Sequence, residues 1–231
     1  MFIGHFALSF AAKRSAPRTS LATTFIAAQL ADLFWPIFLL LGWEQVAIAP
    51  KGNPFLTLDF TSYPWSHSLA TEIGAGVLLG FLYYAATRYT RGALIVGLLV
   101  PSHWVLDLIV HVPDLPLYPG GAARFGFGLW RSPAATAVVE LALFVAGIIV
   151  YARATRARDR IGRFAFWGLV AFLLLIYAGN AFSPPPTNVS ALAWTSLIGW
   201  PLALWPWWVD RHRAPVQAVE APAAAIDALS A

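Results

Sequence analysis

The chain has 231 residues, of which 59% are hydrophobic and 11% charged, and its formal net charge is +4. A soluble domain carries about 25% charged residues, so this composition excludes an ordinary water-soluble globular protein. Cysteine is absent, which excludes disulfides and thiolate metal sites and leaves imidazole and carboxylate groups as metal ligands. The basic residues lie in short loops beside apolar segments. That position indicates a role in membrane orientation, and no nucleic-acid binding is expected.

The order of apolar segments predicts an all-α, polytopic bundle in a membrane. A short helix over residues 2–12 comes first; it is too short to span and is expected to be buried as an N-terminal half-helix. Six segments of about 20 residues follow, each long enough to cross a bilayer: 20–43, 67–88, 91–110, 133–152, 162–182 and 190–209. Residues 1–213 are thus expected to form a single integral membrane domain. Residues 214–231, rich in Ala and Pro, are expected to form a disordered cytoplasmic tail.

Clusters of Lys and Arg alternate with the predicted spans. They lie at residues 13–18, 88–91, 153–163 and 211–213, all on one side of an alternating topology. The positive-inside rule makes this side cytoplasmic. The two long loops, 44–66 and 111–132, then lie outside, and long ordered loops tend to carry function. We therefore expect a multi-pass membrane protein with its basic loops on the cytoplasmic side.

Several ionisable residues fall inside the predicted spans, where each costs at least about 2.5–3.5 kcal/mol on insertion scales. Helix counting at about 1.5 Å per residue gives the depth of each from the basic end of its helix. Asp32, His103 and Glu140 all lie roughly 18–20 Å from the cytoplasmic face by this count. Three such groups from three helices at one depth predict a single shared site.

One of these residues belongs to a pattern typical of metal ligands. His103, Asp107 and His111 are spaced i, i+4 and i+8, which places them on one face of a helix. An imidazole and a carboxylate one turn apart can converge on one cation. Pro113 predicts that this helix ends near His111, which makes His111 a second-tier ligand candidate.

Two further histidines are candidates from other helices. His5 lies on the short N-terminal helix, and His67 lies at the outer mouth of the span that follows it. Helix counting puts His67 roughly 10 Å further out than His103, a mismatch that requires tilt or a loop folded inward. Ser66 is placed to cap the helix after it. Glu72 lies on another face and can bridge to a neighbouring helix.

Four short motifs resemble those of a family of bacterial inner-membrane, LexA-binding, metal-dependent hydrolases. They are Gly4-His5, Ala31-Asp32-Leu33, Ser66-His67-Ser68-Leu69 and His103-Trp104-Val105-Leu106-Asp107, and they cover the first half to two thirds of the chain. The chain departs from the family at Phe34-Trp35, where an acidic and a basic residue are usual. It departs again at Tyr63-Pro64-Trp65, which replaces His-Arg-Gly. More remotely, the order of His and Asp is similar to the zinc-dependent phospholipase C and P1-nuclease group, whose multi-zinc site cleaves phosphodiesters.

The resemblance and the residues together predict a membrane-embedded, metal-dependent hydrolase, and the resemblance implies a multi-pass protein of the bacterial inner (plasma) membrane. Its substrate is expected to be an ester or phosphoester, lipid-like, reached from the extracytoplasmic side. Zinc is favoured over magnesium because imidazole outnumbers carboxylate among the ligand candidates, which are His5, Asp32, His67, His103, Asp107 and His111. Glu140 or Asp114 would accept the proton, and Arg124 and Arg131 are candidates to bind a phosphate.

Two other classes of protein fit the same buried residues. Intramembrane carboxylates and imidazoles also form ion paths, so an ion- or proton-coupled transporter is one alternative. The other is a non-catalytic scaffold, in which polar side chains only hold helices together by hydrogen bonds. Metal content distinguishes the hydrolase from the scaffold.

Overall fold

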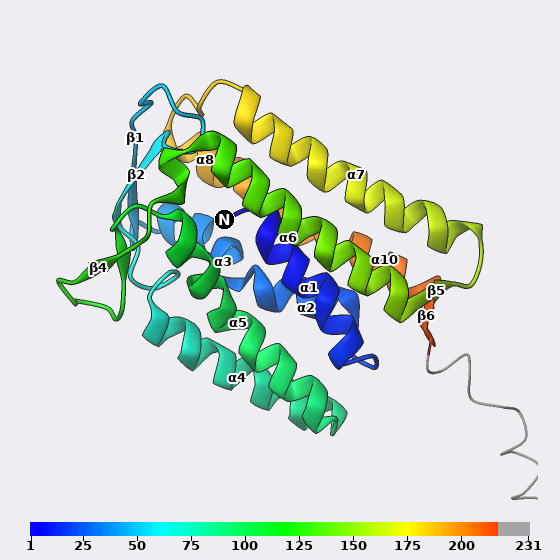
Figure 1. Cartoon of the computed structure of the whole chain (residues 1–231). Helices are drawn as coiled ribbons and strands as arrows, with labels where there is room; N and C mark the ends of the chain where they lie inside the picture. The colour runs from blue at the N-terminus through cyan, green and yellow to red at the C-terminus, as the bar shows by residue number, and fades with distance from the viewer. Residues whose placement is uncertain (217–231) are drawn as a thin grey trace, which may run out of the picture.

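The computed structural model describes residues 1–216 and is mostly helical (Figure 1). Four helices are long and apolar enough to cross a membrane: α4 (Leu69–Thr87), α5 (Thr90–Val110), α6 (Pro133–Ala154) and α7 (Arg160–Phe182). The first and last residues of each helix lie close to the bounds of one predicted span. In Figure 1, α4 and α5 lie on one side of the molecule and α6 and α7 on the other, with α1 and α2 between them. The predicted helical class is confirmed, but a count of six spans is not supported.

The first predicted span, 20–43, is not one straight helix. It consists of α2 (Leu21–Ala28) and α3 (Leu30–Leu40), which are bent by 54° relative to each other. The break falls at Gln29, whose φ of −105° and ψ of 10° leave the helical region. The pair has the geometry of a broken span or a re-entrant loop. Counting it as one span raises the number of candidate spans to five.

The last predicted span, 190–209, is wrong. This segment forms three short helices, α8 (Val189–Ser196), α9 (Gly199–Leu202) and α10 (Leu204–Arg211). Pro201 and Pro206 each lie in the first turn of one of them. Proline lacks an N–H and is tolerated in a first turn, whereas further along it removes a hydrogen bond to the preceding turn and favours a break. The segment is therefore apolar enough for a span, but none of its helices is long enough to cross a membrane.

The short N-terminal helix is present as α1 (Ile3–Ser15) and packs between α2, α5 and α6. Phe10 is fully buried, and its ring meets those of Phe25, Phe144 and Phe166 edge to face. Helix α6 approaches α1 closely at Gly147, where a Cβ would lie 2.4 Å from the carbonyl oxygen of Ala7. This packing holds the beginning of α1 in the centre of the bundle.

Helices α4 and α5 form a closely packed antiparallel hairpin. Gly76 and Gly80 of α4 are four residues apart and face α5, in the small-xxx-small arrangement that lets helix backbones approach. A Cβ at Gly76 would lie 2.4 Å from the carbonyl oxygen of Gly97, and one at Gly80 would lie 2.9 Å from that of Ala93. The opposite face of α4 is exposed and apolar.

Three short two-stranded antiparallel sheets complete the described part of the chain. Strands β1 (Gln45–Ile48) and β2 (Leu58–Ser62) pair at one end of the bundle, where β3 (Leu115–Pro116) also pairs with β4 (Arg124–Phe125) and is followed by the 3-10 helix η1 (Leu129–Arg131). At the opposite end, β5 (Thr155–Ala157) pairs with β6 (Arg213–Pro215). The first two residues of the predicted tail thus belong to β6, and residues 217–231 lie outside the described residues.

Candidate metal centre

All six predicted ligand residues come together inside the bundle. They come from three helices, one turn and one helix cap: His5 from α1, Asp32 from α3, His67 from the turn before α4, His103 and Asp107 from α5, and His111 from the C-terminal cap of α5. Two sets of three donor atoms each lie within 4.8 Å of one another, namely those of His5, His103 and Asp107 and those of Asp32, His67 and His103. Helix counting placed Asp32 and His103 at one depth, and their side chains do lie 3.8 Å apart.

Asp107 is the centre of the cluster, and its side chain is only 2% exposed. Its Oδ1 lies 3.1 Å from Nε2 of His5 and also contacts the amino group of Met1. Its Oδ2 lies 3.4 Å from Nε2 of His103 and 3.6 Å from Nε2 of His111. The i, i+4, i+8 spacing on α5 therefore converges on this one carboxylate, as the helical geometry predicts.

Asp32 supplies a second carboxylate from the other side of the cluster. Its Oδ1 lies 3.4 Å from Nε2 of His67 and 3.8 Å from Nε2 of His103. Unlike Asp107, the Asp32 side chain is 40% exposed. Because Asp32 lies just after the bend at Gln29, the break between α2 and α3 turns the chain at the depth of the cluster.

His67 reaches this depth because the chain before α4 folds inward. The N-cap of α4 is Ser68, whose side chain accepts the Thr71 N–H, so the prediction that Ser66 caps the helix is wrong. His67 therefore lies in the turn that precedes α4, and it is buried. The expected mismatch in depth between His67 and His103 assumed a continuous helix through residue 67, which the structure does not have.

Hydrogen bonds at the Nδ1 atoms define which ring nitrogen faces the carboxylates. Nδ1 of His103 lies 2.8 Å from the carbonyl oxygen of Ala28, which can only accept, so Nδ1 carries the proton. Nδ1 of His111 lies 2.8 Å from Oδ1 of Asp114. Burial lowers the pKa of His111 below its usual value, which favours a neutral ring with its proton on Nδ1. Each ring, when neutral, then presents a lone pair at Nε2.

The donor set fits a divalent cation. Nε2 of His103 has no hydrogen-bond partner within the described residues, although it is buried and faces carboxylate oxygens of Asp32 and Asp107. Lone pairs and carboxylate oxygens repel one another in a buried site unless positive charge lies between them. Metal-binding histidines typically donate their other ring N–H to a carbonyl or carboxylate, as His103 and His111 do.

Asp114 lies behind His111 rather than over the cluster. Its Oδ1 accepts hydrogen bonds from Nδ1 of His111 and, at 2.7 Å, from the hydroxyl of Tyr63. Burial raises the pKa of the Tyr63 hydroxyl, which therefore stays a donor. These contacts support a role in orienting His111, in place of the proton acceptor predicted from the sequence.

Glu140 lies beside the cluster and holds the beginning of α1. Its Oε2 accepts the N–H groups of Phe2, at 2.8 Å, and Gly4, at 3.4 Å. A carboxylate at this position also complements the positive end of the helix dipole. The sequence placed Glu140 at the depth of Asp32 and His103, and the structure places it at the wall of the same cavity.

A cavity of about 210 Å³ opens onto the cluster. Ionisable side chains form one part of its lining: Asp32, His67, Asp107, His111 and Glu140. Aromatic side chains form much of the rest: Phe2, Trp35, Phe55, Phe60, Trp130 and Tyr177. Pro54, Phe55 and Thr57, between β1 and β2, also contribute to the lining, as does Leu58 at the start of β2. The lining therefore combines apolar aromatic side chains with the ionisable side chains of the cluster.

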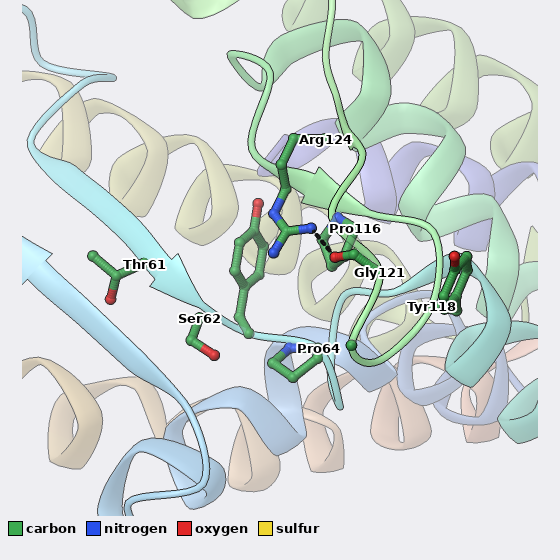
Figure 2. Close-up of a pocket in the computed structure, with 9 residues that line it drawn as sticks. Thr61, Ser62, Pro64, Pro116, Tyr118, Gly121 and Arg124 are labelled. Atoms are coloured by element: carbon green, nitrogen blue, oxygen red, sulfur yellow. Dashed lines mark hydrogen bonds between the residues drawn. The ribbon is translucent and has the colours of Figure 1, made fainter.

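A separate cavity of about 190 Å³ lies beside the hairpin of β3 and β4 (Figure 2). Arg124 lines it, but its guanidinium donates to the carbonyl oxygens of Gly121, at 2.5 Å, and Ala123, at 3.1 Å. Neither Arg124 nor Arg131 is among the residues that line the cavity over the metal-ligand cluster. The geometry thus gives no support to the prediction that they bind a phosphate there.

Sequence reasoning did not identify two residues behind the cluster, of which one contacts His67 and the other contacts that first residue. Glu44 was placed only at the start of an outer loop, and Ser66 only as a helix cap. Both are buried, and Ser66 lies between Glu44 and His67. An acidic residue next to the apolar run of α3 was the one available signal. Glu72 bridges helices as expected, since its Oε2 accepts the Trp104 N–H of α5 at 3.0 Å.

Comparison with protein-family models, curated proteins and solved structures finds no match to this chain. The resemblance to the inner-membrane hydrolases therefore stays a prediction. The fold and the cluster define a class in chemical terms: a strongly apolar helical protein with four buried imidazoles and two carboxylates arranged as metal ligands.

Proposed function

We propose that the protein is a metal-dependent hydrolase embedded in the bacterial inner membrane. The observation that carries this proposal is the unpartnered, buried Nε2 of His103 between the carboxylates of Asp32 and Asp107. A scaffold would hold this nitrogen in a hydrogen bond from a protonated His103 to one of the two carboxylates, and no such hydrogen bond is present among the described residues. A metal centre leaves it free as a ligand.

Zinc is the metal that suits this donor set best. Four imidazoles and two carboxylates surround the site, whereas magnesium prefers oxygen ligands and retains several waters. The four histidines of the cluster are His5, His67, His103 and His111.

The residues around the cavity suit hydrolysis of an ester or phosphoester. A divalent cation supplies Lewis acidity to such a site. Asp32 lines the cavity and contacts His67. It can therefore bind the metal ion at the boundary between the cluster and the substrate. Glu140, on the same cavity, is the candidate proton acceptor. The aromatic wall favours a substrate with an apolar, lipid-like part.

Hydrolysis assays with two chromogenic substrates test this proposal: a long-chain carboxylic ester and a phosphodiester. We expect purified protein in detergent to release product from one of them, with loss of the activity on chelation and recovery on addition of zinc. The variant Glu140→Gln should retain zinc while product release falls at least about tenfold, within the range that a general base contributes. Zinc binding without product release from either substrate would contradict the hydrolase and favour the transporter.

The orientation in the membrane gives a separate prediction. The chain has no cysteine, so single cysteines can be introduced at exposed positions without background. Lys51→Cys and Ala122→Cys, in the two outer loops, should react with an impermeant thiol reagent added to intact cells. Arg156→Cys, in β5 at the basic end, should react only after the membrane is opened. Labelling in the reverse pattern would place the cavity on the cytoplasmic side.

A further inference from the structure

A buried hydrogen-bonded relay runs from Glu44 through Ser66 to His67. Glu44 is 2% exposed, and its Oε1 accepts the N–H groups of Trp65 and Ser66, each at 2.8 Å. Its Oε2 lies 2.6 Å from Oγ of Ser66. Oγ of Ser66 in turn lies 2.7 Å from Nδ1 of His67. All three side chains are buried, so solvent does not compete for these contacts.

The direction of each hydrogen bond in this relay follows from the chemistry of Glu44. A carboxylate only accepts, so the single hydroxyl proton of Ser66 is donated to Oε2 of Glu44. Oγ of Ser66 then has no proton left to donate to His67 and must accept one from Nδ1. With the proton on Nδ1, Nε2 of His67 is a bare lone pair, and it points at Asp32 over 3.4 Å.

We infer that Glu44 is a positioning residue that fixes the metal-binding tautomer of His67 through Ser66. This inference rests on the proposed metal centre for its purpose, but the proton arrangement exists in the metal-free protein. The carboxylate of Glu44 acts over two hydrogen bonds and does not itself touch the cluster. His103 and His111 are set in the same tautomer by a carbonyl and a carboxylate, so His67 would complete a common arrangement.

The variant Glu44→Gln reverses the relay without changing its shape. Two backbone N–H groups face Oε1, so the amide oxygen must occupy that position and the amide NH₂ must face Ser66. The NH₂ then donates to Oγ of Ser66, whose own proton turns to Nδ1 of His67. The proton of His67 moves to Nε2, where it can be donated to Asp32. A metal cannot bind at a protonated Nε2.

Nitrogen-15 NMR of histidine-labelled, chelator-treated protein in detergent micelles reads the tautomer directly. We expect His67 to carry its proton on Nδ1 in the wild type and on Nε2 in Glu44→Gln, with the resonances assigned by their loss in His67→Gln. The Nδ1 tautomer in both proteins, or the Nε2 tautomer in the wild type, would overturn the inference. This readout needs no metal, so it separates the inference from the proposed function.

Zinc affinity provides the second measurement. Glu44→Gln should weaken zinc binding by about 10–100-fold, the usual effect of losing a partner of a metal ligand. Ser66→Ala frees His67 to adopt either tautomer and should therefore weaken binding less than Glu44→Gln does. Asp159→Asn, at the N-cap of α7 at the opposite end of the bundle, is the matched control and should leave affinity unchanged. Equal affinity in Glu44→Gln and the wild type would contradict the role of the relay.

Discussion

The variant Asp107→Asn should lose its co-purifying metal while the protein remains folded and monodisperse in detergent. Asp107 lies within 4 Å of His5, His67, His103 and His111, so it touches most of the proposed ligand set. Removing its charge leaves a cation in a low-dielectric interior with one fewer anionic ligand. The loss in affinity should exceed the 10–100-fold typical of a residue that only contacts a ligand.

The metal-free variant should unfold at a lower temperature than chelated wild type while it remains inserted and monodisperse. Asparagine keeps the size and much of the hydrogen bonding of Asp107, but it removes the charge that pairs with the buried amino group of Met1. Thermal unfolding after chelation measures this loss separately from the loss of metal. Asp59→Asn, on the exposed strand β2, is the control and should keep its metal. Wild-type metal content in Asp107→Asn would rule out the centre as described.

The variant Gly76→Ala should be among the most destabilising glycine-to-alanine substitutions in this chain. Its Cβ would lie 2.4 Å from the carbonyl oxygen of Gly97 and 3.1 Å from Cδ of Pro101, so α4 and α5 must move apart. Overpacking of this kind costs about 1–3 kcal/mol in a well-packed core. The separation also displaces α5 relative to the turn that holds His67, so metal affinity should fall together with stability.

Gly74→Ala is the matched control for this effect. It adds the same methyl group to the same helix, two residues away, where nothing lies within 4 Å of the new Cβ. Replacing a helical glycine by alanine at such an exposed site should stabilise by roughly 0.5–1 kcal/mol. Thermal unfolding in detergent, followed by circular dichroism, measures both variants. Equal unfolding temperatures would mean that the α4–α5 contact is not as close as described.

Much of the helical architecture could be predicted because long apolar segments bounded by basic residues define it. Helices α4 to α7 begin and end near their predicted positions for this reason. Composition did not reveal where an apolar run stops being one helix. The bend at Gln29 and the breaks before α9 and α10, whose first turns contain Pro201 and Pro206, are local backbone events. They reduce the expected count of spans.

The ligand cluster was predictable because helix geometry converts sequence spacing into depth and face. His103, Asp107 and His111 lie on one face of α5, and Asp32 lies at the same depth on another helix. His67 was harder to place, because a turn rather than a helix sets its depth. The partners behind the ligands were not predictable. Glu44 and Asp114 lie in loops, whose fold no periodicity describes, and only the structure shows which imidazole each one reaches.

Elemental analysis of the purified wild-type protein tests the central claim most directly. The account predicts at least one zinc ion per chain after purification without added metal, and its removal by chelation should lower the unfolding temperature. Zinc added back should restore that temperature, because a ligand that binds only the folded state stabilises it. A protein that contains no transition metal, and whose unfolding temperature does not change with zinc, would contradict the account and leave the polar cluster as a purely structural feature.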